Sequence, residues 1–285
     1  MKIGFMQGRL SPIENGLIQS FPSNNWQNEI HLASENKLDT VEWTMDYKDL
    51  YKNPILNPEG ILELNALKEK YDISIPSLTG DCFMQKPFWK ESKSHRKKLQ
   101  EDFINILHGC NKVSISIVLI PLVDNGSIEN NKQEQILYEF LSSKKDLIKD
   151  LSLRVCFESD FSPNRLKKFI SFYDEDIFGI NYDTGNSAAM GYNPIEEFQS
   201  YGERIINMHI KDRLFGASTV PLGEGDTNFD LIFDLIKKYN YNGNLILQTA
   251  RSENNDHLGV LLKYFKLVQK FAIKHNIKIN NNNES

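Results

Sequence analysis

The chain has 285 residues, of which 40% are hydrophobic and 25% charged, a balance typical of a globular protein with one large core. Its formal charge of -5 disfavours broad electrostatic attraction to nucleic acid or to an anionic membrane. The sequence contains neither a secretory signal nor the roughly 18 consecutive apolar residues of a membrane helix. We therefore expect a cytoplasmic protein with a small-molecule ligand, no nucleic-acid partner and no membrane association.

Short β-rich runs alternate with amphipathic helical patterns along the whole chain. The predicted strands are 2–6, 40–44, 73–78, 113–120, 153–158, 178–183, 205–210 and 244–249. The predicted helices are 25–36, 58–70, 93–109, 131–149, 163–172, 194–202, 228–239 and 256–274. Strands separated by helices of this length run parallel, and eight such units close readily into a barrel. The sequence thus predicts an α/β fold: one (β/α)8 TIM barrel over residues 1–277, followed by a disordered polar tail, 278–285.

The longest predicted loop follows the seventh strand, from Lys211 to about Asn228. Loops after barrel strands lie at the C-terminal mouth, so this loop would overhang the mouth as a lid. Glu224 lies between Gly223 and Gly225, whose backbone freedom would let its carboxylate bend towards a ligand. The same Gly-Glu-Gly segment also fits plain turn chemistry, and the sequence leaves both interpretations open.

Each of the last four predicted strands ends in a side chain that can bind a metal: Glu158, Asp183, His209 and Gln248. The strand ends of a parallel barrel converge on one mouth, and this donor set suits a hard or borderline divalent cation. Asp183 could instead cap a turn, and His209 could be a hydrogen-bonded core histidine. Glu158 is harder to explain without a partner, because a carboxylate that ends an apolar strand is costly to bury alone.

Cationic side chains follow the strands at the same predicted mouth: Arg9, Lys211, Arg213 and Arg251. Arginine forks suit phosphate or carboxylate groups, and the loops after strands seven and eight often seat phosphate. The pattern therefore predicts an anionic or phosphorylated sugar, unless Arg213 and Arg251 form rim salt bridges with Glu224, Glu253 or Asp256. Further candidates for substrate contacts are Gln7, Glu42, Trp43 and Asn186.

Several motifs, taken in order, resemble the xylose isomerase-like barrels, a family of sugar phosphate isomerases and epimerases. They are GFMQGRLSP, VEW, FESD, YDTGN, HIKDR, and LGEGDTNF before LQTAR. The resemblance implies one divalent metal ion, manganese, magnesium or zinc, held by Glu158, Asp183, His209 and the residue at position 248. Relatives are often dimers or tetramers, so a homo-oligomer is a further expectation.

The chain departs from the family pattern at position 248, where the best-understood epimerases carry a second glutamate. In those relatives two glutamates on opposite faces of the substrate remove and return a proton, whereas the amide of Gln248 cannot accept one. We expect Glu158 to act as both ligand and base. Candidates for the missing acid or base are Glu224, Lys211, Asp212 and Glu42.

The leading hypothesis is a metal-dependent isomerase or epimerase that removes a proton next to the carbonyl of a sugar, sugar phosphate or keto-polyol. A metal-stabilised enediolate would follow. A keto-polyol dehydratase on the same scaffold begins with the same step, and the sequence does not separate the two reactions. The non-enzymatic alternative is a sugar-binding barrel that has lost turnover. The apurinic endonuclease branch fits less well, because its multi-zinc site needs more histidines at strand ends.

Overall fold

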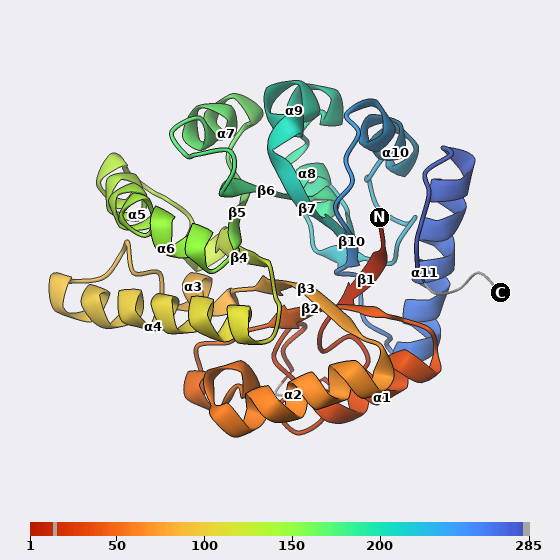
Figure 1. The fold of residues 1–285 in the computed structure, drawn as a ribbon. Coiled ribbons are helices and arrows are strands. Elements are labelled where there is room, and N and C mark those ends of the chain that lie inside the picture. The colour runs from red at the N-terminus through yellow and green to blue at the C-terminus, as the bar shows by residue number, and fades with distance from the viewer. Residues whose placement is uncertain (14–15, 282–285) are drawn as a thin grey trace.

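The computed structural model describes residues 1–13 and 16–281, which form a closed barrel of parallel strands surrounded by helices (Figure 1). The strands, in order around the barrel, are β1 (Ile3–Met6), β2 (Thr40–Thr44), β3 (Ser74–Thr79), β4 (Ile117–Leu122), β5 (Arg154–Ser159), β6 (Phe178–Asp183), β7 (Ile205–Ile210) and β10 (Leu245–Leu247). Strand β10 pairs with β1 and closes the ring. The predicted (β/α)8 barrel is confirmed.

Helices cover the outside of the barrel (Figure 1). They are α1 (Trp26–Glu35), α2 (Pro58–Tyr71), α4 (Lys93–Lys112), α5 (Asn131–Ser143), α6 (Lys145–Asp150), α7 (Pro163–Ile170), α9 (Pro194–Tyr201), α10 (Phe229–Lys238) and α11 (His257–Lys274). Two short helices outside the predicted set, α3 (Asp81–Gln85) and α8 (Thr184–Met190), begin at the carboxyl ends of β3 and β6. Both therefore bring their first turn to the mouth of the barrel.

Two predicted elements differ from the observed ones. The single helix predicted over 131–149 is split at Lys144 into α5 and α6. The fourth strand begins at Ile117 rather than 113, because Ser114 has a φ of 60° and belongs to the turn that leaves α4. A residue with left-handed backbone geometry cannot continue a regular strand.

The predicted polar tail also begins too early. Asn281 is buried, accepts a hydrogen bond from the backbone N–H of Ile3 (2.8 Å) and donates one to the carbonyl of Ile3 (2.9 Å). A second bond from its amide reaches Asp39 (2.7 Å), so the segment up to residue 281 packs under β1. The side-chain amide of Asn281 bonds both backbone groups of Ile3, as the backbone of a neighbouring strand would. Composition alone does not reveal such a contact. Residues 282–285 of the predicted tail lie outside the described residues.

The strands alternate between two environments. Glu42 of β2 points into the barrel, where it bonds His209. Its neighbour Trp43 points outwards and packs against Trp26 of α1, with ring centroids 5.8 Å apart. This period of two puts the polar chemistry inside the ring and the large apolar side chains in the layer between barrel and helices.

The three cysteines, Cys82, Cys110 and Cys156, are buried and unpaired. Within residues 1–13 and 16–281, no helix combines the length and the apolar character that a membrane crossing requires.

The loop after β7 is braced rather than free. Its start forms a small antiparallel pair, β8 (Asp212–Arg213) with β9 (Thr219–Val220). The buried carboxylate of Asp212 then accepts hydrogen bonds from the backbone N–H groups of Gly223, Gly225 and Thr227. The predicted lid is thus folded around one aspartate, and Asp212 is a structural residue rather than an acid facing a ligand.

Candidate metal and substrate site

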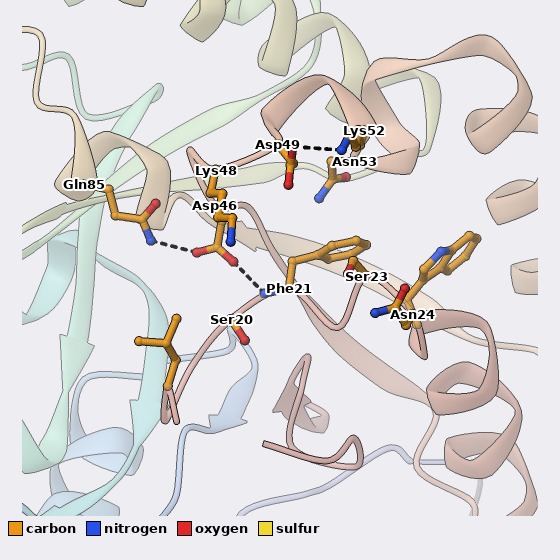
Figure 2. A pocket seen from close by; sticks show the side chains of 12 residues that line it. Ser20, Phe21, Ser23, Asn24, Asp46, Lys48, Asp49, Lys52, Asn53 and Gln85 are labelled. Atoms are coloured by element: carbon orange, nitrogen blue, oxygen red, sulfur yellow. Dashed lines mark hydrogen bonds and ion pairs between the residues drawn. The ribbon is translucent and has the colours of Figure 1, made fainter. Parts of the chain in front are cut away.

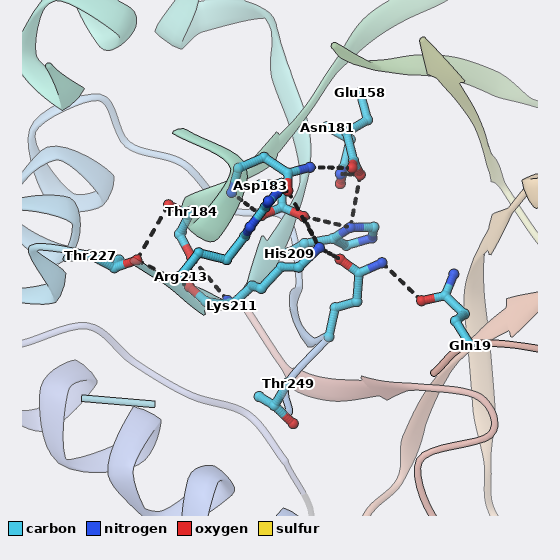
Figure 3. Close-up of polar contacts among 12 residues, drawn as sticks. Gln19, Glu158, Asn181, Asp183, Thr184, His209, Lys211, Arg213, Thr227 and Thr249 are labelled. Atoms are coloured by element: carbon cyan, nitrogen blue, oxygen red, sulfur yellow. Dashed lines mark hydrogen bonds and ion pairs between the residues drawn. The ribbon is translucent and has the colours of Figure 1, made fainter. Parts of the chain in front are cut away.

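Three of the four predicted metal ligands meet at the mouth of the barrel (Figure 3). Glu158 near the end of β5, Asp183 at the end of β6 and His209 in β7 each place one ligand atom within 4.8 Å of the others. All three side chains are buried. Parallel strands in register explain this convergence, since Asp183 pairs directly with His209 across β6 and β7.

The orientation of His209 is fixed by Glu42. The imidazole Nε2 lies 2.7 Å from Glu42 Oε1, while Nδ1 lies 3.0 Å from Glu158 Oε2 and 3.9 Å from Asp183 Oδ2. In the neutral imidazole that a metal would bind, Nε2 donates its proton to Glu42 and Nδ1 presents a lone pair towards the two carboxylates. The contact of Nδ1 with Glu158 is close enough for an ion pair but does not have the geometry of a hydrogen bond.

The site has a strong preference for positive charge. Burial opposes a charged imidazole, but Glu42 and then Glu158 outweigh it and raise the pKa of His209 to about 10. Burial likewise favours a neutral Glu42, yet the contact with His209 and the hydrogen bonds from Ser77 and Asn207 leave the Glu42 pKa below its ordinary value. A cation between His209 and the two carboxylates would therefore meet a pocket already arranged for it.

Glu42 is not at the surface where a substrate would bind. It is fully buried, and its Oε2 accepts hydrogen bonds from Ser77 Oγ (2.6 Å) and Asn207 Nδ2 (2.8 Å). The expectation that Glu42 contacts substrate or serves as the second acid or base is wrong, because the barrel interior encloses both of its oxygens. Its place in the site is to orient His209.

Two asparagines hold the Glu158 carboxylate. Asn181 Nδ2 donates to Oε2 (2.8 Å), and Asn186 Nδ2 donates to Oε1 (2.7 Å). Asn186 reaches this position because Asp183 Oδ1 caps α8 by accepting from the Asn186 backbone N–H (2.8 Å). Asp183 thus caps a turn and also directs its other oxygen to the site, so both sequence interpretations of this residue hold.

Lys211 and Gln248 form the remaining side of the cluster. Lys211 Nζ donates to Asp183 Oδ2 (3.2 Å) and to Gln248 Oε1 (3.0 Å). The amide nitrogen of Gln248 donates to Gln19 Oε1 (3.0 Å). The predicted fourth ligand atom, Gln248 Oε1, is therefore held by an ammonium group.

The charge balance suits a divalent ion. Three carboxylates, those of Glu42, Glu158 and Asp183, and the ammonium of Lys211 leave two net negative charges when His209 is neutral. Together with His209 Nδ1, these carboxylates fit a divalent cation with one imidazole and two carboxylate ligands. Gln248 is a less direct candidate ligand, because its Oε1 would have to give up the hydrogen bond from Lys211 before it could bind the metal.

A cavity of about 540 Å³ borders this cluster at Glu158, Lys211 and Gln248. It is large enough for a monosaccharide, since ligand pockets generally span about 300–1,000 Å³. Six of the predicted site residues line it: Arg9, Glu158, Asn186, Lys211, Arg213 and Gln248. The guanidinium of Arg213 donates to Asn186 Oδ1 (2.8 Å) and to the carbonyl of Ala217, so no rim salt bridge to an acid engages it among the described residues.

Arg9 is mostly committed to the protein. It is buried, and its guanidinium donates to the carbonyl oxygens of Thr249 (3.0 Å) and Ile18 (3.1 Å) and to Gln19 Oε1 (3.4 Å). It therefore shapes the rim of the cavity more than it offers donors to a ligand.

Besides Asp212 and the buried Glu42, Asp183 and His209, four predicted site residues do not line this cavity: Gln7, Trp43, Glu224 and Arg251. Gln7 is buried and accepts from the Thr44 backbone N–H, and Trp43 packs outside the barrel. Arg251 donates to the carbonyl of Ser11 rather than to Glu253 or Asp256. The alternative of rim salt bridges is thus wrong for both arginines within the described residues.

Glu224 is exposed, and its charge acts on Tyr264 of α11, away from the cluster. The Gly-Glu-Gly segment is therefore turn chemistry, because Gly223 and Gly225 present their backbone N–H groups to Asp212. The prediction that Glu224 is the missing acid or base finds no support in this position.

A second cavity, of about 570 Å³, lies beside the first and shares Leu17 and Gln85 with it. Figure 2 shows Asp46 in its lining, accepting from the side chain of Gln85 (2.7 Å) and from the backbone N–H of Phe21 (2.7 Å). None of the three converging metal-ligand candidates lines this second cavity. Glu158 lines the first cavity, so we assign the candidate chemistry to that cavity.

Sequence reasoning missed several residues of the site. Asn181 and Asn207 stand two positions before Asp183 and His209, on the same inward face of their strands. A polar residue at every second position of an otherwise apolar strand is a signal that could have found them. Gln19 and Asp81, which also line the cavity, lie in a loop and at a helix start, where no such periodicity exists.

Residues 30–266 match the xylose isomerase-like TIM barrel family. An inosose dehydratase of Clostridium botulinum (strain Eklund 17B / Type B) is 26% identical over 155 residues, covering 46% of this chain and 52% of the relative, so the match spans about half of that enzyme. A putative L-ribulose-5-phosphate 3-epimerase SgbU of Haemophilus influenzae is 24% identical over 260 residues, covering 84% and 89%.

The fold is similar to a xylose isomerase-like TIM barrel protein from Mycobacterium smegmatis, solved in complex with magnesium. The TM-score is 0.71 at 16% identity, with 96% of this chain and 97% of that chain covered. The relatives in the first two comparisons are named as sugar- and polyol-modifying enzymes. Because the family match extends over most of the sequence, the chain belongs to the xylose isomerase-like TIM barrel family.

Proposed function

We propose that this protein is a divalent-metal-dependent enzyme that removes a proton next to the carbonyl of a sugar, sugar phosphate or keto-polyol. The observation that carries the proposal is the convergence of His209 Nδ1 with the carboxylates of Glu158 and Asp183, of which Glu158 borders the cavity. A metal held there by His209, Glu158 and Asp183 would polarise the substrate carbonyl and stabilise the enediolate charge.

Glu158 is the proposed base. Its carboxylate borders the cavity and is held in place by Asn181 and Asn186, so the oxygen that accepts a proton is already positioned. One positioned base contributes about 10² to 10⁴ in rate, which falls short of the typical enzymatic acceleration and leaves room for electrostatic stabilisation. Lys211 would supply part of this stabilisation, because its ammonium lies between Asp183 and Gln248 at the cavity wall.

Isomerisation or epimerisation is the first candidate outcome, in line with the epimerase SgbU among the relatives. Dehydration of a keto-polyol is the second candidate, and a specific observation favours it. The amide of Gln248 cannot take up a proton, and its oxygen is already bonded to Lys211. Position 248 therefore offers no second base, while the similarity to inosose dehydratases fits a reaction that needs an acid for the leaving hydroxyl instead.

The substrate is proposed to be anionic or to carry several hydroxyl groups. Lys211 and Arg213 bring positive charge to the cavity, and Asn186 and Thr249 add neutral hydrogen-bonding groups. A cytoplasmic location and a homo-oligomeric state remain predictions, as does the absence of a nucleic-acid partner.

The test is a deuterium-exchange screen. The protein would be incubated in heavy water with manganese, magnesium or zinc and a panel of ketoses, sugar phosphates and keto-polyols, and products would be read by NMR and mass spectrometry. Label at a carbon next to a carbonyl, lost in Glu158→Gln, supports the proposal. If no compound gains label with any metal, and the protein binds no metal, the sugar-binding alternative replaces it.

A further inference from the structure

Asp81 is a buried acid in the wall of the same cavity that Glu158 borders. It is the first residue of α3, directly after β3, and only 7% of it is exposed. Two other acids outside the metal cluster line this cavity, but Asp124 is exposed and Asp160 is half-buried and bonded to Ser127. Among the described residues, Asp81 is therefore the buried carboxyl group that lines this cavity without belonging to the cluster.

Asp81 is tied to the cluster through two amides whose orientation is determined. Lys211 can only donate, so it must bond the oxygen of Gln248, whose nitrogen then donates to Gln19 Oε1 (3.0 Å). The nitrogen of Gln19 is left to donate to Asp81 Oδ2 (2.6 Å). This bond occupies Oδ2, whereas no hydrogen bond to Oδ1 occurs within the described residues, so Oδ1 is available to carry a proton.

The surroundings of Asp81 favour its neutral form near neutral pH. Burial raises its pKa to about 7, opposed by the hydrogen bond from Gln19 and assisted by the negative charges of Asp46 and Glu158. His209 acts in the lowering direction, and Arg9 also faces this carboxyl group from the β1 loop. Asp46 is drawn in Figure 2, where it bridges Gln85 and Phe21 at the neighbouring cavity.

We propose that Asp81 is the general acid of the reaction and protonates a hydroxyl group of the substrate as that group leaves. The proposal rests on the proposed function, because Glu158 must first remove the proton next to the carbonyl. The C–H electrons form the new C=C bond, the C–O bond to the neighbouring carbon breaks, and the oxygen takes the proton of Asp81 to depart as water. Glu158 ends protonated and Asp81 ionised, and solvent restores both.

The position of Asp81 decides between the two candidate outcomes. A base for inversion must face the same carbon as Glu158 from the opposite side, close to the metal cluster. Asp81 stands farther out, separated from Gln248 by the whole side chain of Gln19. An acid set apart from the cluster in this way suits a hydroxyl on a neighbouring carbon better than the carbon that Glu158 would deprotonate. The geometry thus points to a keto-polyol dehydratase.

The experiment separates the two proton transfers in the full-length, metal-loaded protein. Asp81→Asn keeps a side-chain oxygen for the Gln19 amide but cannot donate an acidic proton. The matched control is Asp102→Asn, which removes a buried carboxylate bonded to Tyr51, outside the cavity. The probes are keto-inositols and 2-keto sugar acids. The first proton transfer is measured as solvent exchange at the carbon next to the carbonyl, and water elimination is measured as the ultraviolet absorbance of the enone product.

Asp81→Asn should lose water elimination by about 100-fold or more, the usual contribution of a general acid, while solvent exchange continues. In the wild type, elimination should decline as pH rises through about 7, because the acid form is required, and Asp81→Asn should lack this decline. Asp81→Glu, which retains a carboxyl group, should recover part of the turnover and confirm that the effect is chemical rather than structural.

If the wild type exchanges the substrate proton with solvent and Asp81→Asn still eliminates water at the full rate, Asp81 is not the general acid. The proposed function would then stand. Equal loss of exchange and elimination in soluble Asp81→Asn also overturns the role of Asp81 as the general acid, because Asp81 would then act on the first proton transfer. If the wild type exchanges no substrate proton, the proposed function itself fails, and the acid role of Asp81 fails with it.

Discussion

Replacing Glu42 by glutamine should weaken metal binding without removing a ligand. Glu42 accepts from three donors: Ser77 Oγ and Asn207 Nδ2 on Oε2, and His209 Nε2 on Oε1. A glutamine has only one oxygen, and two donors compete for it at the Oε2 position. Its NH2 group must then face His209 Nε2, which would have to become the acceptor.

The Glu42→Gln substitution should thus move the imidazole proton of His209 from Nε2 to Nδ1, the nitrogen that faces the metal site. With Nε2 accepting, Nδ1 carries the proton and donates towards Glu158 Oε2, 3.0 Å away. The lone pair needed for a metal is lost, and the net charge of the cluster falls from two negative charges to one. Partners that orient a ligating histidine typically contribute 10–100-fold to metal affinity, or about 1.4–2.7 kcal/mol, and we expect a loss in this range.

The assay is calorimetric titration of metal-free protein with zinc and manganese, combined with ¹⁵N NMR of His209 to identify the protonated nitrogen. Ser77→Ala is the control, since it removes one donor to Glu42 but keeps the carboxylate and its Oε1 acceptor; its affinity should change by about threefold or less. Wild-type affinity in Glu42→Gln, with the proton still on Nε2, would refute the reasoning that Glu42 sets the tautomer.

The remaining predictions concern the other carboxylate positions. Gln248→Glu should tighten divalent-metal binding by about tenfold, because it adds a negative charge beside the cluster, although part of the gain is lost to an ion pair with Lys211; unchanged or weaker affinity in the same titration argues against position 248 as a ligand. Glu224→Gln should keep normal solvent exchange and turnover, since Glu224 is exposed and outside the cavity; a large loss of either would restore it as the acid or base. Asp81 has a folded pKa of about 7, above its ordinary 3.8, so its stabilising contribution is complete below about pH 3.8 and is lost as pH rises through 7. In metal-free melting curves, the melting temperature of Asp81→Asn should therefore rise relative to that of the wild type as pH increases from 5 to 8. A difference in melting temperature that does not vary with pH would contradict the raised pKa.

The barrel and the main site were accessible from the sequence because both depend on local, periodic signals. Eight alternating strand and helix patterns determine a parallel barrel, and a barrel places every strand end at one mouth. Glu158, Asp183 and His209 each end or lie within a buried strand, so their convergence follows from topology alone.

The alternation of side chains along a strand could also have predicted the polar residues that share the inward face with the candidate ligands. Asn181 and Asn207 share the inward face with Asp183 and His209, as Glu42 does on β2. The sequence placed Glu42 at the mouth because strand periodicity gives the face but not the depth within the barrel. Only the packed structure shows that its carboxylate lies enclosed beside His209.

The sequence by itself determined the class of fold, since strand order and side-chain alternation follow from local pattern, and its motifs indicated the family and three candidate metal ligands. Only the tertiary structure decided which donors and acceptors meet, and it placed Asp81, the proposed acid, in the cavity wall. Gln19, in a loop, and Asp81, at the start of α3, are 62 residues apart, and their bond depends on how Lys211 and Gln248 are oriented. Contacts of this kind arise from packing between loops, where no sequence period records which side chains will touch.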